Sequence, residues 1–313
     1  MDRIGIALVG AGKIVRDQHL PAIAADPRFE LKGYFAPHSD IQGARAYADL
    51  DALLADPEVT AVSICTPPQP RHDIALKALA AGKHAMLEKP PASTVGQIED
   101  VRDAAAAARL SLFATWHSQH APAVETARRY LAGKTLRAVK VDWLEDVRRW
   151  HPGQAWIWEA GGMGVFDPGI NALSILSRIL PERIFVQSAE LSFPSNQAAP
   201  IAVKLSLQAT SGAQVAATFD WRQQGPQTWD IRAETADGSL VELSMGGAEL
   251  KLDGRAQEVG PEREYPEIYA RFADLVARGE SEVDIAPLQQ VADAYLVGRR
   301  LEVEAFVDDS ARP

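Results

Sequence analysis

The stretch RIGIALVGAGKI, residues 3–14, decides the fold of the first part of this chain. Its apolar run favours a β-strand, and a helical stretch follows the glycines through about residue 25. Gly10 and Gly12 occupy the first two positions of a G-x-G-x-x-G fingerprint, whose third position holds Val15. Glycines between a strand and a helix let the backbone turn tightly and approach a pyrophosphate at the helix N-terminus. The stretch therefore predicts a dinucleotide site, with a glycine turn in an unrelated α/β protein as the alternative.

Strand and helix patterns alternate over the first 118 residues. Strands are expected at 29–36, 60–68, 83–91 and 111–117, and helices at 49–56, 71–82 and 94–110. Such alternation is typical of a parallel sheet with helices on both faces. We therefore predict an N-terminal dinucleotide-binding domain over residues 1–118, with its ligand at the carboxyl ends of the strands.

The residues expected to contact the cofactor share that edge of the sheet. They are Gly10, Gly12, Lys13, Ile14, Pro37, His38, Ser39, Thr66, Pro67, Pro68, His72, Glu88, Lys89, Trp116 and His117. An acid at the end of the second strand would bind the ribose 2′-hydroxyl of NAD and repel the phosphate of NADP. Residues 36–39 contain no acid and no arginine, while His38 and Ser39 can donate hydrogen bonds. We expect both cofactors to bind, with NADP modestly favoured.

The segment HAMLEKPP, residues 84–91, carries the strongest catalytic signal in the first domain. A strand inside a parallel sheet should be apolar throughout. This one ends in Glu88 and Lys89, and two prolines then fix the path of the chain. The pattern places Lys89 at the cofactor cleft. The alternative is a solvated strand end, because lysine side chains are usually exposed.

A second group of polar and aromatic residues lies between residues 139 and 158. Val139, Val141, Trp143 and Glu145 share one face of an expected strand, and a carboxylate that ends an apolar row indicates a ligand or a partner. Four of the seven tryptophans fall in residues 143–158. Flat aromatic surfaces with a few polar groups suit the apolar faces and polar rim of a sugar ring. The alternative is that these tryptophans are core residues.

The segment GVFDPGIN, residues 164–171, precedes an apolar helix. Asp167 is expected to cap that helix, with Pro168 at its first position. Asn171 follows one turn later, on the same helix face as Asp167. Capping alone would explain the aspartate, and a role in a site is compatible with capping.

The rest of the chain predicts one antiparallel sheet and two helices. Strands are expected at 184–194, 201–208, 214–221, 228–234 and 239–244, and helices at about 265–278 and 286–305. A broad sheet with one face free of helices often forms an oligomer interface. We therefore expect a homo-dimer or homo-tetramer.

The length, charge and composition of the chain limit the classes of protein to which it can belong. The 313 residues suit two domains, and a net charge of −10 argues against a nucleic-acid surface and gives no reason to expect membrane binding. The start resembles no signal peptide, and no apolar run approaches the ~18 residues of a membrane span. One cysteine, Cys65, suits a reducing cytoplasm. The histidines show no HExxH pair, so we expect no metal.

The motifs GAGKI, TPP and EKP together resemble the glucose–fructose oxidoreductase / inositol dehydrogenase / rhizopine-catabolism family, and the resemblance covers the whole chain. It implies an α/β protein with an N-terminal Rossmann domain and a C-terminal α/β domain, here residues 119–313, built on a large, mainly antiparallel sheet. The family usually shows G-G-x-x-x-x-D-x-G-x-H in the second domain. Residues 161–171 read GGMGVFDPGIN, so Asn171 stands where the family has histidine.

Within the family, EDVRRWHPGQAWIWE (145–159), FATWHS (113–118) and GPEREYP (260–266) resemble the bacterial NAD(P)-dependent aldose 1-dehydrogenases. Those enzymes oxidise the anomeric carbon of L-arabinose or D-galactose to a lactone, the first step of non-phosphorylating sugar catabolism. The residues that this resemblance assigns to the substrate are Lys89, His117, Glu145, Trp150, His151, Asp167, Asn171 and Trp229.

Hydride transfer from an anomeric carbon requires that the C1 hydroxyl lose its proton and that the oxygen's rising charge be stabilised. We expect Lys89 and Asp167 to share that proton, while Asn171, which cannot act as a base, orients the sugar. The rival hypothesis is a regulator of the same fold that senses dinucleotide or sugar without turnover. The presence of both Lys89 and Asp167 argues against it.

Overall fold

The computed structural model describes residues 3–37 and 40–307. The chain forms two compact units, the first built from residues 1–117 with 263–285 and the second from 118–262 with 286–313. The sequence prediction divided the chain once, after residue 118. The structure adds a later segment, 263–285, to the first unit.

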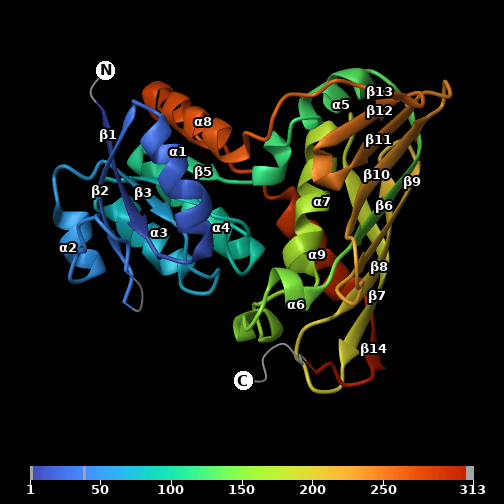
Figure 1. Cartoon of the computed structure of the whole chain (residues 1–313), viewed down its shortest axis with the longest axis horizontal. Helices are drawn as coiled ribbons and strands as arrows, with labels where there is room; N and C mark the ends of the chain where they lie inside the picture. Colours follow the sequence, from blue (N-terminus) through green and yellow to red (C-terminus); the bar gives the residue numbers. More distant parts are fainter. Residues whose placement is uncertain (1–2, 38–39, 308–313) are drawn as a thin grey trace. The chain divides into compact units, whose positions relative to one another are not determined.

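The first unit contains a five-stranded parallel sheet with strand order β2-β1-β3-β4-β5 (Figure 1). Its strands are β1 (Ile4–Val9), β2 (Phe29–Phe35), β3 (Ala61–Ile64), β4 (His84–Leu87) and β5 (Leu112–Ala114). Its helices are a π-helical turn η1 (Val15–His19), α1 (Leu20–Ala25), α2 (Leu50–Ala55), α3 (Arg71–Ala80), α4 (Val95–Ala108) and α8 (Glu264–Arg278). The predicted parallel sheet with alternating helices is confirmed.

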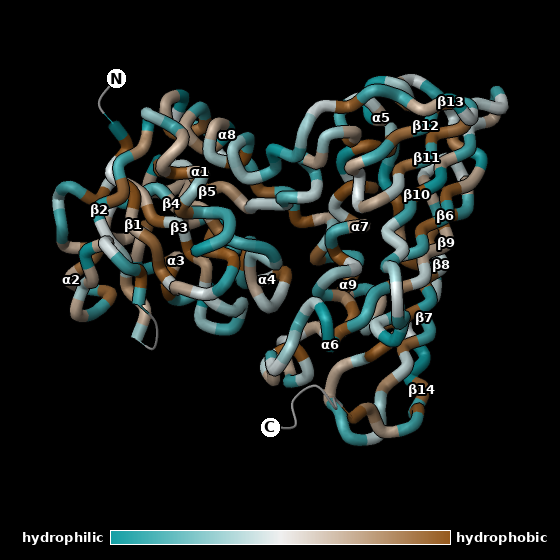
Figure 2. Tube along the Cα trace, viewed as in Figure 1, coloured by the Kyte–Doolittle hydropathy of each residue, from teal (hydrophilic) through white to brown (hydrophobic). Residues whose placement is uncertain are grey.

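Helix α8 belongs to the first unit because its apolar face fits the core of that unit. Tyr265, Ile268, Tyr269 and Phe272 recur at helical spacing and are buried against residues of β1, β2, β4 and β5. Hydrophobic colour marks strands β1 and β3 in Figure 2. A helix that buries such a stripe gains most of its stability from packing rather than from its own propensity.

The second unit contains a nine-stranded sheet with strand order β13-β12-β11-β10-β6-β9-β8-β7-β14. Its strands are β6 (Leu136–Leu144), β7 (Ile184–Pro194), β8 (Ala202–Ala209), β9 (Gln214–Asp220), β10 (Thr228–Thr235), β11 (Leu240–Ser244), β12 (Glu249–Leu252), β13 (Arg255–Ala256) and β14 (Arg299–Val303). The helices are η2 (His117–His120), α5 (Val124–Leu131), α6 (Val147–Trp150), η3 (Ala155–Trp158), α7 (Phe166–Ile179), η4 (Met245–Gly247) and α9 (Ala286–Val297). The first residue of η2, His117, is the last residue of the first segment of the first unit.

This sheet is mostly antiparallel, as predicted, but two of its pairings, β6 with β9 and β14 with β7, are parallel. The prediction of a helix over 286–305 is wrong in its last part. Helix α9 ends at Val297, and Arg299–Val303 form β14 instead. A Cβ on the intervening Gly298 would lie 2.3 Å from the Ala294 carbonyl oxygen, so the chain turns closely there before it joins the sheet edge.

Helix α7 is the buried helix that the sequence predicts, but its start differs. It begins at Phe166, Val165 is at the N-cap and makes no side-chain capping hydrogen bond, and Asp167 is the second helical residue. The prediction that Asp167 caps this helix is therefore wrong. Gly169 allows the close approach of α7 to the sheet, because a Cβ there would lie 2.5 Å from the ring of Phe219 on β9.

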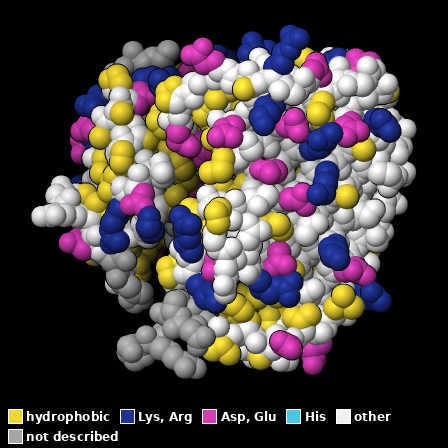
Figure 3. Space-filling view, turned by 45° about the vertical axis from the view of Figure 1, so that its right-hand side comes forward, with side chains coloured by type: hydrophobic (Ala, Val, Ile, Leu, Met, Phe, Trp, Pro, Cys, Tyr) yellow, Lys and Arg dark blue, Asp and Glu magenta, His cyan; other side chains and the backbone are white. Residues whose placement is uncertain are grey.

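Helices α5, α7 and α9 lie on one face of the nine-stranded sheet (Figure 1). Among the described residues no helix covers the other face, over which cationic and anionic side chains are mixed (Figure 3). Within the described ranges, no helix is long and apolar enough to span a bilayer.

Candidate functional site

The turn after β1 has the geometry of a dinucleotide cradle. Gly10 has φ +102°, and a Cβ on it would lie 3.1 Å from the Cys65 carbonyl, so this position suits only glycine. A Cβ on Gly12 would meet no atom of residues 3–37 or 40–307 within 4 Å. No contact with these residues therefore requires glycine at position 12, whereas a pyrophosphate lying against the turn would. These residues fit NAD or NADP.

Lys13 and Ile14 follow this turn, and both are exposed. Pro37, beyond β2, is also exposed, while His38 and Ser39 lie outside the described residues. The structure adds Arg16, whose Nη2 donates to the Asp40 carbonyl oxygen at 3.2 Å. An arginine thus reaches the segment that follows β2, although none occurs in residues 36–39. Its only signal in the sequence is its place four residues after Gly12.

The EKPP segment is held by a buried arginine that the sequence reasoning missed. Arg71, the first residue of α3, donates from Nη1 to the carbonyl oxygens of Glu88 and Pro90 and from Nη2 to that of Thr66. One guanidinium therefore ties the end of β4 to the loop that follows β3. Lys89 lies between two of the anchored carbonyls and is partly exposed.

Glu88 points into the protein. Its Oε1 accepts hydrogen bonds from Tyr265 at 2.7 Å and pairs with His19 Nε2 at 3.0 Å, and its Oε2 accepts from the Lys89 backbone N–H at 3.0 Å. The second ring nitrogen of His19 lies 2.8 Å from the Tyr269 hydroxyl. The predicted cofactor contact of Glu88 remains a prediction, and the carboxylate is already surrounded by partners.

This buried cluster shifts two pKa values. Burial raises the pKa of Glu88, but its hydrogen bond with His19 and the charges of His19 and His117 outweigh burial and bring it to about 2. Burial lowers the pKa of His19, but Cys65, Tyr269 and Glu88 outweigh burial and hold it well above its usual value. The pair is therefore an imidazolium and a carboxylate at neutral pH.

His117 lies in the first unit with a partner from α8. Its Nδ1 is 2.7 Å from Glu264 Oε2, and its ring stacks on Tyr265 at 6.0 Å. Burial lowers the pKa of His117, but the Glu264 carboxylate outweighs burial, so the pKa is raised. Neither partner could be inferred from sequence, because about 147 residues separate His117 from Glu264.

Five other predicted cofactor residues follow β3 and β5. Thr66 is half-buried, Pro67 exposed and Pro68 buried in the loop after β3. His72 Nε2 lies 2.8 Å from Asp100 on α4. Trp116 is 2% exposed, and its indole N–H donates to the Asp284 carbonyl at 2.8 Å. The indole is thus anchored inside the first unit.

In the second unit, Glu145 directly follows β6 and continues the buried row of that strand, as predicted. Val139, Val141 and Trp143 are buried on the same face. Both carboxylate oxygens of Glu145 accept indole hydrogen bonds: Trp221 Nε1 lies 3.2 Å from Oε1 and Trp229 Nε1 lies 2.9 Å from Oε2.

The tryptophans form two groups of rings, one on each side of Glu145, which accepts a hydrogen bond from Trp229 of one group and from Trp221 of the other. The ring of Trp229 stacks on that of Trp143, with 5.9 Å between the ring centroids, and its centroid lies 5.1 Å from that of Trp150. The ring centroids of Trp158 and Trp221 are also 5.1 Å apart. Trp150 is 39% exposed, whereas Trp221 is fully buried. The cluster therefore contains both core and accessible rings. Trp221, which the sequence reasoning missed, immediately follows β9.

His151 lies within ion-pair distance of two buried carboxylates, those of Glu145 and Asp167. Its Nε2 is 3.8 Å from Glu145 Oε1 and 3.6 Å from Asp167 Oδ2. Asp167 is 4% exposed, and Asn171, one turn further along α7, is half-buried. Three of the predicted substrate residues thus meet in one cluster, built from the end of β6, the loop after α6 and the first turn of α7.

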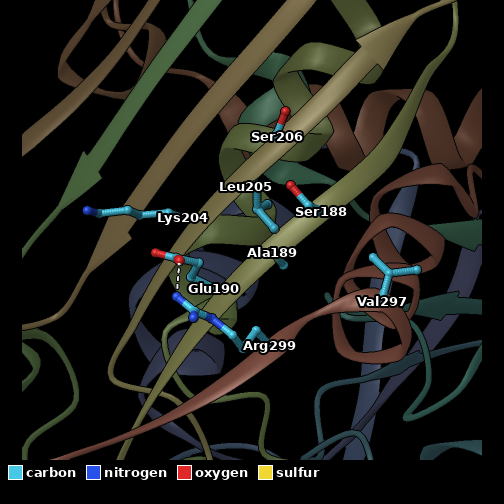
Figure 4. Close-up of a pocket in the computed structure, with 8 residues that line it drawn as sticks. All are labelled: Ser188, Ala189, Glu190, Lys204, Leu205, Ser206, Val297 and Arg299. Carbon is cyan, nitrogen blue, oxygen red and sulfur yellow. Dashed lines mark hydrogen bonds and ion pairs between the residues drawn. The ribbon is translucent and has the colours of Figure 1, made fainter.

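Two pockets of the second unit lie along its sheet. One, of about 400 Å³, lies along β7 and β8 and is lined by Glu190, Lys204 and Arg299, with Arg299 paired to Glu190 at 2.6 Å (Figure 4). Another, of about 260 Å³, includes Asp142 and Asp230. No group of three or more metal-ligating side chains occurs among the residues that the structure describes.

Comparison with known proteins agrees with this geometry. Residues 4–115 match the model of the GFO_IDH_MocA oxidoreductase family, NAD-binding Rossmann fold. The chain is 45% identical over 311 residues to galactose 1-dehydrogenase of Pseudomonas fluorescens, covering 98% of this chain and 100% of that protein.

Two solved structures extend the comparison. The D-galactose-1-dehydrogenase protein from Rhizobium etli is 52% identical, with a TM-score of 0.94 over 98% of this chain and 99% of that one. The 3-ketoreductase KijD10 from Actinomadura kijaniata, solved with NADP and TDP-benzene, is 18% identical with a TM-score of 0.82 over 96% of this chain and 100% of that one. The second likeness concerns the fold alone.

Proposed function

This chain belongs to the glucose–fructose oxidoreductase / inositol dehydrogenase / rhizopine-catabolism family of NAD-binding Rossmann oxidoreductases, and we propose that it oxidises an aldopyranose at C1 to the aldonolactone. D-galactose is the first candidate substrate, because the two similar proteins named above are galactose dehydrogenases. L-arabinose is the second, because it shares the ring stereochemistry of D-galactose and lacks only the hydroxymethyl group at C5.

The observation that carries the proposal is the cluster of Glu145, His151 and Asp167 beside the tryptophans. It combines flat apolar surfaces with convergent polar groups, which is the chemistry that recognises a sugar. Trp229 donates to Glu145 and contacts Trp150, so the ring surface and the carboxylate are fixed relative to each other. Asn171 supplies an amide on the same helix as Asp167.

In this proposal NAD or NADP supplies the hydride acceptor, C4 of the nicotinamide. Lys89 and Asp167 share the proton of the C1 hydroxyl, with the Asp167 carboxylate as its acceptor. Lys89 also stabilises the charge that rises on the C1 oxygen, and Asn171 orients the sugar. The Arg71 hydrogen bonds on either side of Lys89 hold its backbone in place. NADP is modestly preferred over NAD, because no acid occupies 36–39 and Arg16 reaches the segment after β2.

The test is a substrate panel with the purified protein. NADP or NAD is mixed with D-galactose, L-arabinose and other aldoses, and the reduced cofactor is followed by absorbance. We expect reduction with D-galactose or L-arabinose and release of the lactone. Cofactor binding without reduction by any sugar would support the rival hypothesis of a sensor.

We also propose that the protein is a homo-dimer or homo-tetramer in which two copies associate through the open sheet face. On that face β6 and β10 place Lys140 opposite Arg232 and Asp142 opposite Asp230. Like charges directly across a strand pair are destabilising. Burial and the charge of Asp142 raise the pKa of Asp230. A two-fold contact would set the acidic pair of one copy on the basic pair of the other.

The oligomer is tested by sedimentation and light scattering. Lys140→Glu should lower the measured mass toward that of one chain, because the basic pair of each copy loses its match. The double variant Lys140→Asp with Asp142→Lys exchanges the positive and negative charges at these two positions. Opposite charges can then meet again across the two-fold contact, so the assembly should recover. A mass unchanged by Lys140→Glu would refute this interface.

A further inference from the structure

The side chains of Glu145, His151 and Asp167 differ in their exposure to solvent, and this difference matters for proton transfer. The His151 side chain is 16% exposed, against 6% for Asp167 and 4% for Glu145. The imidazole is therefore the member of the cluster that reaches solvent best. Its Nε2 lies within ion-pair distance of both carboxylates, at 3.6 Å from Asp167 Oδ2 and 3.8 Å from Glu145 Oε1.

The three side chains around Asp167 differ in what they can do with a proton. The amide of Asn171 cannot accept one at neutral pH. The oxygens of Glu145 are both engaged by indole N–H donors, so this carboxylate is held in place beside His151. The imidazole of His151 is the group whose ordinary pKa lies in the physiological range. Trp221 packs on the ring at 5.3 Å and limits its movement.

We propose that His151 is a proton-relay residue that resets Asp167 after each turnover, an inference that rests on the proposed function. In the oxidation, the hydride leaves C1 for the nicotinamide and the C1 hydroxyl proton passes to an Asp167 oxygen. The proton then moves from Asp167 to His151 Nε2, which leaves Asp167 ionised and creates an imidazolium. Glu145, whose Oε1 lies 3.8 Å from the same ring nitrogen, stabilises the imidazolium by its negative charge. His151 returns the proton to water when the product leaves.

Chemical rescue tests the relay. His151→Ala, assayed with NADP and D-galactose, should lower kcat by roughly 100-fold, the scale of a lost acid–base group. Added imidazole should restore kcat at least 10-fold in a saturable manner, because a free base can then take the proton from Asp167. Pyrazole, which has the same ring size but is a far weaker base, should not. His151→Gln should lose kcat with little change in the KM for sugar.

Asp167→Ala is the matched control, because imidazole cannot replace the carboxylate that touches the sugar. Equal stimulation of both variants by imidazole would overturn the relay, as would a His151→Ala protein that is not rescued or that changes KM alone. Should His151→Ala fail to fold, the kcat and KM of His151→Gln decide between the relay and simple sugar binding. Failure of the wild-type protein to oxidise any sugar would instead refute the proposed function, and the relay with it.

Discussion

The substitution Glu88→Gln removes the negative charge from the buried cluster of the first unit while it keeps the size of the side chain. In the folded protein the pKa of Glu88 falls from 4.5 to about 2. A shift of one pKa unit corresponds to about 1.4 kcal/mol, so the lowered pKa contributes about 3 kcal/mol to the free energy of unfolding at neutral pH. The amide can still accept one of the hydrogen bonds from Tyr265 or the Lys89 N–H, but it leaves the His19 imidazolium without its counter-charge.

The pH dependence of this stabilisation has two limits. Because the pKa of Glu88 is lowered, its contribution is present above pH 4.5 and is lost as the pH falls from there toward 2. Because the pKa of His19 is raised, its contribution is present below pH 6.5 and is lost as the pH rises through the folded-state value. The ion pair therefore stabilises most between pH 4.5 and 6.5. Glu88→Gln should flatten the stability profile at both ends.

Scanning calorimetry at pH 6 is the assay, and the transition of the first unit is the one to follow. A loss of about 3 kcal/mol should lower its Tm by roughly 6–12 °C. Six of the seven tryptophans belong to the second unit, so tryptophan fluorescence monitors that unit separately and should change little.

Glu58→Gln is the matched control in the same unit. Glu58 is an exposed partner of Lys32, 67% exposed, and its loss should cost under about 1 kcal/mol. The reasoning is refuted if Glu88→Gln lowers the free energy of unfolding of the first unit no more than Glu58→Gln does. It is also refuted if the stability of the Glu88→Gln protein depends on pH as that of the wild type does. Either result would show that the buried ion pair does not stabilise the first unit.

Three further predictions concern turnover and cofactor choice. Lys89→Ala and Asp167→Ala should each lower kcat by at least ~100-fold with an unchanged melting curve, and near-wild-type steady-state turnover in either would remove that residue from catalysis. Asn171→Ala should impair kcat less than Lys89→Ala, because a hydrogen-bonding group rather than an acid–base group is lost; the reverse order would show that the roles are misassigned. Pro37→Asp should shift kcat/KM toward NAD, and Arg16→Ala should lower kcat/KM for NADP roughly 10-fold more than for NAD; an unchanged ratio in both would show that these residues do not face the ribose.

The local signals in the sequence predicted much of the fold. Residues 3–14 and the alternation that follows were sufficient for the parallel sheet, because glycine turns and apolar strands are properties of neighbouring residues. The alternation of Val139, Val141, Trp143 and Glu145 predicted their common buried face for the same reason. The helix end at Val297 was missed, because α9 gives way to a strand only where a sheet edge is available to pair with it.

The functional residues can be divided in the same way, into those that local sequence patterns predict and those that tertiary contacts bring together. The sequence by itself determined that Glu88 and Lys89 lie at the carboxyl end of a buried strand, directly after its last residue, and that Asp167 and Asn171 share a helix, because both follow from strand and helix periods. Only the tertiary structure decided that Glu88 turns inward to His19 and Tyr265, and that His151 lies within ion-pair distance of Glu145 and Asp167. Those contacts join residues far apart in the chain, or on different elements, through packing and charge compensation, and no local period of the sequence encodes which distant side chain fills a given buried space.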